Sequence, residues 1–285
     1  AVAATSAFAT RALLLDKGFI GLPPEGATPS TPENGELVLH YFGPNPGQHG
    51  KSRVWVYADG RVISLRDAPV PVGANEWSTG FLEQRLSPEG VERLRSEVAS
   101  STGVGQPPPN AAPLPFYTLI EVRDGDQLVP VEWASDQARL ESRLSDPASW
   151  LPTGAWQHVE YRAYVPSRFA VCSGGWPPDQ PIERSRLLSL LPAVAQDLLR
   201  DSERREGPLF GSPGNFHPSY EYCADAKAED ARTLAETLDD SGPSKRGGAL
   251  RLNWRFEATG ASRETAHIWF EPYLPHGDFT CSVCG

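Results

Sequence analysis

The four cysteines are the residues whose type and spacing best suit metal binding, redox chemistry or disulfide formation. All four lie in the second half of the chain. Cys172 and Cys223 are isolated, whereas Cys281 and Cys284 form a C-x-x-C pair. A four-cysteine zinc site normally draws on two close pairs, and here only one pair is close. A redox-active C-x-x-C usually opens a helix after a strand, whereas this pair stands near the last residue. We therefore favour structural disulfides, and the zinc and redox interpretations stay open.

The pairing of these cysteines is not fixed by their number, because four cysteines allow three connectivities. We expect one tail cysteine to reach back to Cys172 and the other to Cys223, because these bonds would pin the end of the chain. An even number of paired cysteines is typical of proteins outside the reducing cytoplasm. The cysteines therefore predict an extracytoplasmic protein, either secreted or membrane-anchored.

The remaining chemistry-bearing residues form no known catalytic motif. The chain has no H-E-x-x-H, G-x-S-x-G, phosphate-loop or G-x-G-x-x-G motif, and its histidines share no metal-ligand spacing. Glu257 and Glu271 lie on two predicted strands and could act as paired carboxylates beside His267. Solvent-facing positions on a half-buried sheet are the simpler interpretation of the two glutamates, and the one that we favour. We therefore predict no catalytic residue, no metal site and no cofactor.

Two aromatic loops are the best candidates for a binding surface. The first follows Cys172 and presents Trp176, Pro177 and Pro178 after two glycines; the second presents Phe210, Phe216 and Tyr220. Tryptophan and tyrosine are favoured anchors of interfaces, and prolines stiffen the chain around them. Packing of Trp176 over the core is the more ordinary interpretation, because most aromatic side chains serve packing.

Hydrophobic patterning predicts an α+β fold of two tandem hairpin–helix–hairpin modules, with antiparallel sheets and helices packed on one face. In the first module, alternation predicts a strand over 36–42 and a hairpin over 53–65, turning at Asp59-Gly60 in a type I′ turn. Ser87 and Pro88 are typical of a helix start, and Val91, Leu94 and Val98 form one apolar stripe through about residue 100. A second hairpin, 116–123 with 127–133, has Pro130 at an edge or bulge, and a short helix follows over 135–144.

The second module repeats this order of elements. Residues 158–165 and 167–175 are predicted to be a strand pair, and 183–200 a helix that bends or restarts at Pro192. A helix over 228–239 and a hairpin of 249–258 with 264–274 complete the module. We expect an anchor stub and Pro/Gly-rich tether over 1–35, a first module over 36–152 and a second module over 153–285.

Composition excludes several classes of function. The 285 residues carry a formal net charge of -10, which argues against a protein that neutralises nucleic-acid phosphates. A hydrophobic content of 39% is too high for a disordered chain. Only four of the 26 basic residues are lysines, a bias that we attribute to a GC-rich bacterial genome.

Four strings resemble a family of uncharacterised extracytoplasmic proteins of GC-rich bacteria, which carry an N-terminal signal or anchor before a tether. They are YADGRVI (57–63), STGFLEQRLSPEGVERLRSE (78–97), YVPSRFAVCSGGWPPDQPIERSRLLSLLP (164–192) and PYLPHGDFTCSVCG (272–285). The resemblance implies an extracytoplasmic location and recurring cysteines, and no assigned activity.

These observations lead to one expected function and two alternatives. We expect an exported, non-catalytic binding domain that contacts another macromolecule or a component of the bacterial cell envelope, with a possible membrane tether before the fragment. The first alternative is an extracytoplasmic hydrolase with a dispersed active site. The second is a protease-inhibitor-like module, which the Pro/Gly-rich loops on small hairpin–helix units would suit.

Overall fold

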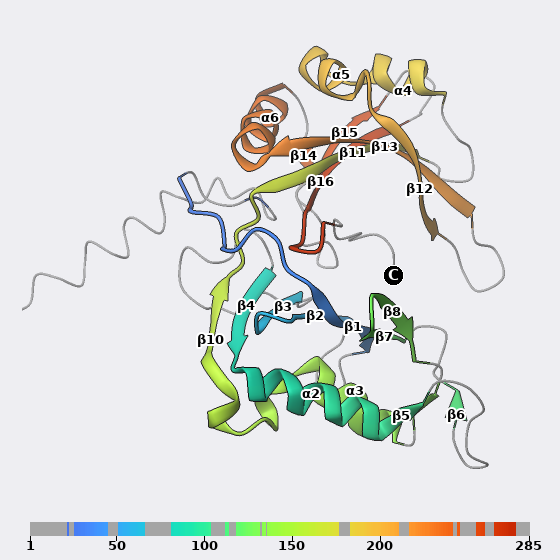
Figure 1. Ribbon diagram of the computed structural model, residues 1–285. Coiled ribbons are helices and arrows are strands. Elements are labelled where there is room, and N and C mark those ends of the chain that lie inside the picture. Colours follow the sequence, from blue (N-terminus) through green and yellow to red (C-terminus); the bar gives the residue numbers. More distant parts are fainter. Residues whose placement is uncertain are drawn as a thin grey trace, which may run out of the picture. The chain divides into compact units, whose positions relative to one another are not determined.

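The computed structural model describes residues 22, 26–44, 51–65, 81–103, 112–113, 118–131, 133–134, 136–176, 183–210, 217–241, 244–245, 255–259 and 265–277. These residues form two compact units. The N-terminal unit contains the described residues from Thr31 to Tyr164, and the C-terminal unit contains Val165 onward together with Leu22 and residues 26–30. Both units combine antiparallel sheets with helices, so the predicted α+β class is confirmed (Figure 1).

The N-terminal unit is built on a seven-stranded antiparallel sheet. Its strand order is β10-β4-β3-β2-β1-β7-β8. The strands are β1 (Leu37–Pro44), β2 (Lys51–Tyr57), β3 (Arg61–Leu65), β4 (Phe81–Leu86), β7 (Leu119–Asp124), β8 (Gln127–Pro130) and β10 (Trp156–Ala163). Because β8 is the outermost strand of this order, the edge position predicted from Pro130 is confirmed.

The β2–β3 hairpin forms as predicted, but its turn differs from the expected type I′. Strand β2 ends at Tyr57 and β3 begins at Arg61, so three residues connect the strands. Gly60 N donates to Tyr57 O at 2.9 Å, which makes Ala58 and Asp59 the central residues, and Gly60 follows with φ +89°. The Asp59 carboxylate accepts a hydrogen bond from Arg61 N at 3.1 Å, and this bond favours the longer connection.

Two helices cover one face of this sheet (Figure 1). Helix α2 (Pro88–Ser101) begins after Ser87, whose Oγ accepts a hydrogen bond from Gly90 N, and α3 (Gln137–Ser145) begins after Asp136, which caps Arg139 N. The predicted stripe of Val91, Leu94 and Val98 is buried against the sheet. The same core includes Leu39, Tyr41, Val54, Val56, Val62, Leu86, Ile120, Leu140 and Leu144.

Short elements connect these parts of the N-terminal unit. Three two-residue strands form a small sheet in the order β5-β9-β6. They are β5 (Thr102–Gly103), β6 (Ala112–Pro113) and β9 (Trp133–Ala134). Two 3-10 turns, η1 (Pro147–Ser149) and η2 (Thr153–Ala155), lead into β10.

The C-terminal unit contains a six-stranded antiparallel sheet in the order β12-β13-β11-β16-β15-β14. The strands are β11 (Arg168–Trp176), β12 (Glu203–Phe210), β13 (His217–Lys227), β14 (Ser244–Lys245), β15 (Arg255–Thr259) and β16 (Thr265–Pro272). The pairing of β15 with β16 confirms the predicted final hairpin.

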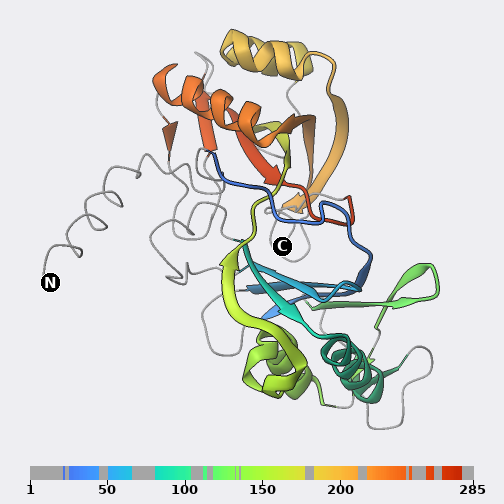
Figure 2. The same cartoon turned by 60° about the vertical axis from the view of Figure 1, so that its left-hand side comes forward.

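Three helices cover one face of the six-stranded sheet, as both views show (Figures 1 and 2). They are α4 (Arg184–Leu190), α5 (Ala193–Leu199) and α6 (Ala228–Ser241). The interruption between α4 and α5 falls at Leu191 and Pro192, as the sequence predicts. The core under these helices includes Phe169, Val171, Leu187, Leu199, Ala231, Leu234, Leu238, Ile268 and Phe270.

The strand pair expected over 158–165 and 167–175 is not a pair. Strand β10 pairs with β4 in the N-terminal sheet, whereas β11 pairs with β13 and β16 in the C-terminal sheet. The chain therefore enters the C-terminal unit at Val165. Local alternation identifies both strands, but the choice of neighbour depends on contacts far along the chain.

Candidate functional site

A disulfide joins two adjacent interior strands of the C-terminal sheet. Cys172 on β11 and Cys223 on β13 are register partners, with Cα atoms 4.1 Å apart, and their sulfurs are bonded. The expected connectivity, in which each tail cysteine reaches back to one of them, is therefore wrong. The two cysteines are 51 positions apart in the sequence, and nothing in that stretch indicated that their strands are neighbours. Cys281 and Cys284 lie outside the described residues.

The disulfide lies on the sheet face that the helices do not cover. Along β11, Phe169 and Val171 point into the core under the helices, whereas Ala170 and Cys172 form a separate cluster with Cys223. Trp269 of β16 and Tyr273, which directly follows this strand, pack against the cluster. Because successive side chains of a β-strand point to opposite faces of the sheet, the disulfide lies in an apolar cluster separate from the core under the helices.

A polar group borders this disulfide cluster. Arg168 donates to the Asp225 carboxylate at 2.6 Å, and the Tyr273 hydroxyl also donates to that carboxylate. The Arg168 guanidinium lies over the Tyr273 ring, 4.7 Å from its centroid. Because Arg168 and Asp225 are about half exposed, this ion pair adds little stability. With the Tyr273 hydroxyl, it links β11 and β13 to the residue that follows β16.

The backbone brings the two predicted aromatic loops to one end of the C-terminal sheet. Gly174 on β11 is the register partner of Glu221 on β13, and Glu221 is also the partner of Arg205 on β12. Trp176 therefore ends β11 at the same end of the sheet where β12 passes into β13. The described backbone places Trp176 at the end of β11, Phe210 at the end of β12 and Tyr220 within β13, so the expectation that these three residues lie in loops is wrong. Pro177, Pro178 and Phe216 lie outside the described residues.

The three residues of the dispersed hydrolytic alternative lie on neighbouring strands. Glu257 on β15 and His267 on β16 are register partners. Glu271 is buried, so the solvent-facing position expected for it is wrong. It lies four residues along β16 from His267, which at about 3.3 Å per residue separates their Cα atoms by about 13 Å. The sheet therefore places Glu257 beside His267 and keeps Glu271 apart from both.

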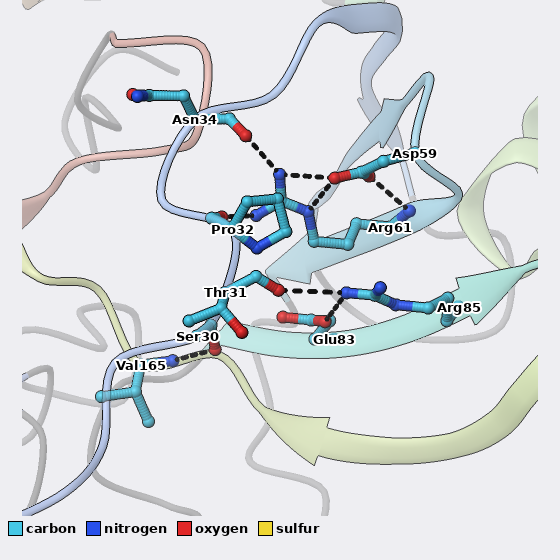
Figure 3. Close-up of polar contacts among 9 residues, drawn as sticks. All are labelled: Ser30, Thr31, Pro32, Asn34, Asp59, Arg61, Glu83, Arg85 and Val165. Carbon is cyan, nitrogen blue, oxygen red and sulfur yellow. Dashed lines mark hydrogen bonds and ion pairs between the residues drawn. The ribbon is translucent and has the colours of Figure 1, made fainter.

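Sequence reasoning missed a wholly buried arginine in the N-terminal unit. The side chain of Arg61 has no exposed surface, and its Nε donates to Asp59 at 2.8 Å (Figure 3). Its remaining donors reach the backbone carbonyls of Pro32 and Asn34, and its guanidinium lies 5.3 Å from the centroid of the Tyr57 ring. The string YADGR is therefore a turn that carries its own buried cation. Charged residues beside a turn are usually exposed, so nothing in the sequence indicated that the Arg61 side chain would be buried.

Arg61 and Arg85 bind a segment that lies within the tether predicted over residues 1–35. Arg85 Nη2 donates to Thr31 O at 3.3 Å, so two arginines of the sheet together bind three backbone carbonyls within residues 31–34 (Figure 3). In the C-terminal unit, Ser30 N donates to Val165 O at 2.8 Å, and Val165 N donates to Ser30 Oγ at 3.0 Å. Residues 30–34 are therefore part of the folded structure.

A histidine–carboxylate pair crosses the helix-free face of the N-terminal sheet. His40 is the register partner of Trp55 on one side and Glu121 on the other. Its Nδ1 lies 2.9 Å from Glu121 Oε2, and its ring stacks on Trp55 with centroids 5.5 Å apart. The ring is held on both sides, and these contacts fit a structural role for His40.

Comparisons with models of protein families, with curated proteins and with solved structures find no match to the chain. The family resemblance of the four motifs therefore remains an expectation. Within the described ranges, no helix is long and apolar enough to cross a membrane. Nor do the described His, Cys, Asp and Glu residues include a group of three placed to hold a metal ion.

Proposed function

We propose that this protein is an exported, non-catalytic binding domain of the bacterial cell envelope, and that the loop-bearing end of its C-terminal sheet contacts the partner. The observation that carries the proposal is the disulfide between the two strands that hold Trp176 and Tyr220. Cys172 precedes Trp176 by four residues, and Cys223 follows Tyr220 by three. The bond thus holds the strands from which both loops leave.

A disulfide that holds the two strands together favours recognition by the loops that these strands carry. Binding costs less free energy when the segments that make contact are held in place before the partner arrives. Loops on a rigid sheet commonly carry binding residues, and tryptophan and tyrosine are frequent anchors. The disulfide also supports an oxidising compartment, because such bonds persist mainly outside the cytoplasm.

Co-sedimentation with purified cell-wall sacculi and with envelope membrane fragments tests this proposal. We expect the purified protein to pellet with one of these fractions, and the double variant Trp176→Ala, Tyr220→Ala to stay in the supernatant. Val194→Ala is the matched control, because Val194 is an exposed apolar residue on α5. Failure of the wild-type protein to pellet with either fraction would remove the envelope partner.

The hydrolase alternative keeps one structural argument, the register pairing of Glu257 with His267. Turnover of ester, peptide or glycoside substrates that is lost in His267→Asn would replace the binding proposal with this one. Inhibition of extracellular proteases by the wild-type protein would instead favour the protease-inhibitor-like alternative.

A further inference from the structure

We propose that Arg61 and Arg85 form a binding site for an extended peptide segment of another protein, and that residues 31–34, the strap, occupy this site until the peptide displaces them. The site belongs to the N-terminal unit. It shares no residue with the disulfide or with the candidate loops of the C-terminal unit, so it goes beyond the proposed function.

The strap is bound through its backbone. Arg61 donates hydrogen bonds to the carbonyls of Pro32 and Asn34, and Arg85 donates one to the carbonyl of Thr31 (Figure 3). All four strap residues are exposed. A segment of another protein that presents carbonyls with the same spacing can therefore make these contacts, whatever its side chains.

The charges around the site favour a neutral acceptor over an anion. Arg61 is paired with Asp59 at 2.7 Å and Arg85 with Glu83 at 3.3 Å, so these four side chains carry no net charge. A phosphate or carboxylate ligand would meet the carboxylates of Asp59 and Glu83, and like charges repel. A backbone carbonyl accepts a hydrogen bond without bringing a charge, so a peptide backbone is the ligand that fits the site.

The strap can leave the site without unfolding the sheet. None of its side chains is buried, whereas Leu37 at the start of β1 is buried. Segments with few buried apolar contacts open at a lower free energy than the core. Before the strap, Ser30 forms two hydrogen bonds with Val165. These flanking contacts keep the strap near the two arginines, so it rebinds once a competing peptide dissociates.

Exchange of the strap for another peptide is favoured over simple opening. The Arg61 side chain has no exposed surface, and loss of the strap carbonyls would leave donors of this buried cation unpaired. An unpaired buried donor is unfavourable. A peptide that supplies equivalent carbonyls removes this penalty.

Fluorescence polarisation of a labelled synthetic peptide of residues 26–36 tests the proposal on the full chain. The strap competes from within the same chain, so we expect weak but measurable binding to the wild type. Ser30→Ala removes the hydrogen bond between Ser30 Oγ and Val165 N, and we expect this variant to bind the peptide about three to ten times more tightly. Arg85→Ala in the Ser30→Ala background is expected to weaken binding about tenfold.

Two controls separate the site from other effects. Thr28→Ala changes an exposed residue before the strap and is expected to leave the Kd of the wild type unchanged. A peptide with alanine at the positions of Thr31, Glu33 and Asn34 is expected to bind within about threefold of the original, because recognition uses carbonyls. Loss of binding by this alanine peptide would overturn recognition through the backbone.

Hydrogen exchange of the wild-type chain with the alanine peptide adds a measurement that needs no protein variant. Ser30 N donates to Val165 O at 2.8 Å, so its exchange is slow while the strap is bound. We expect saturating peptide to speed exchange at Ser30 and to leave the amides of β3 unchanged. Unchanged exchange at Ser30, or no binding of either peptide to the wild type and to Ser30→Ala, would overturn the proposal and leave the envelope-binding proposal in place.

Discussion

Asp59 holds the buried guanidinium of Arg61 through an ion pair of 2.7 Å, although only one residue separates them in the sequence. The same carboxylate also accepts a hydrogen bond from the backbone N of Arg61. One short turn therefore reverses the chain and neutralises the charge that it buries. The carbonyls of Pro32 and Asn34 complete the shell and tie residues 31–34 to the sheet.

Asp59→Ala tests the stability contribution of this pair. Removing one partner of a buried ion pair typically costs about 3–5 kcal/mol. We expect about 2–4 kcal/mol here, because Asp59 is partly exposed and Arg61 keeps two carbonyls. Urea unfolding measures the loss, and Asp124→Ala at the exposed end of β7 is the control. Equal stabilities for the two variants would contradict the anchoring role of Asp59.

Gly60→Ala separates steric clash from backbone strain. An added Cβ at Gly60 would lie 2.3 Å from the carbonyl oxygen of Leu86, whereas at Gly125 it would meet nothing within 4 Å. Both glycines have positive φ, so alanine at either position costs about 1–2 kcal/mol of backbone strain. We expect Gly60→Ala to lose about 1–3 kcal/mol more than Gly125→Ala in the same unfolding assay, because the β3–β4 contact must shift.

Leu94→Ala tests the packing of α2 on the N-terminal sheet. Leu94 is fully buried in the core between helix and sheet, so its truncation is expected to cost about 2–5 kcal/mol. Leu119→Ala is the matched control, because Leu119 is 38% exposed and its truncation is expected to change stability by no more than about 0.5 kcal/mol. Unchanged thermal unfolding of Leu94→Ala would show that α2 turns a different face to the sheet.

Alkaline pH is expected to destabilise the N-terminal unit through two buried tyrosines. Burial raises the pKa of Tyr41, with Glu141 adding to the rise, and burial also raises the pKa of Tyr164, which Glu83 raises further and Arg61 lowers. In the unfolded chain a tyrosine has a pKa of about 10. The contribution of each protonated hydroxyl to the free energy of unfolding is therefore fully present below about pH 10, and it is lost as the pH rises above this value.

Urea unfolding between pH 8 and 11 measures this dependence. Each tyrosine that stays protonated in the folded state lowers the stability by about 1.4 kcal/mol per pH unit above pH 10. The double variant Tyr41→Phe, Tyr164→Phe is expected to lose less stability over this range than the wild-type chain. Parallel pH profiles for the two proteins would mean that neither tyrosine is coupled to folding.

Several elements follow directly from local sequence. Ser87 caps α2 and its apolar stripe is buried, and Pro192 ends one helix before another begins. Alternating residues identify both strands of the β2–β3 hairpin and of the β15–β16 hairpin. Such features depend on residues within one or two turns of each other, so the sequence alone contains their cause.

Only the tertiary structure decided three other features. They are the bond between Cys172 and Cys223, the position of β10 in the N-terminal sheet and the burial of Arg61. For the candidate site, the sequence supplied the aromatic loops and the cysteines, whereas strand register supplied their common position at one end of a sheet. Each of these relationships joins strands or segments that are distant in the chain. Their choice depends on which surfaces bury each other in the folded state, and no local pattern encodes that choice.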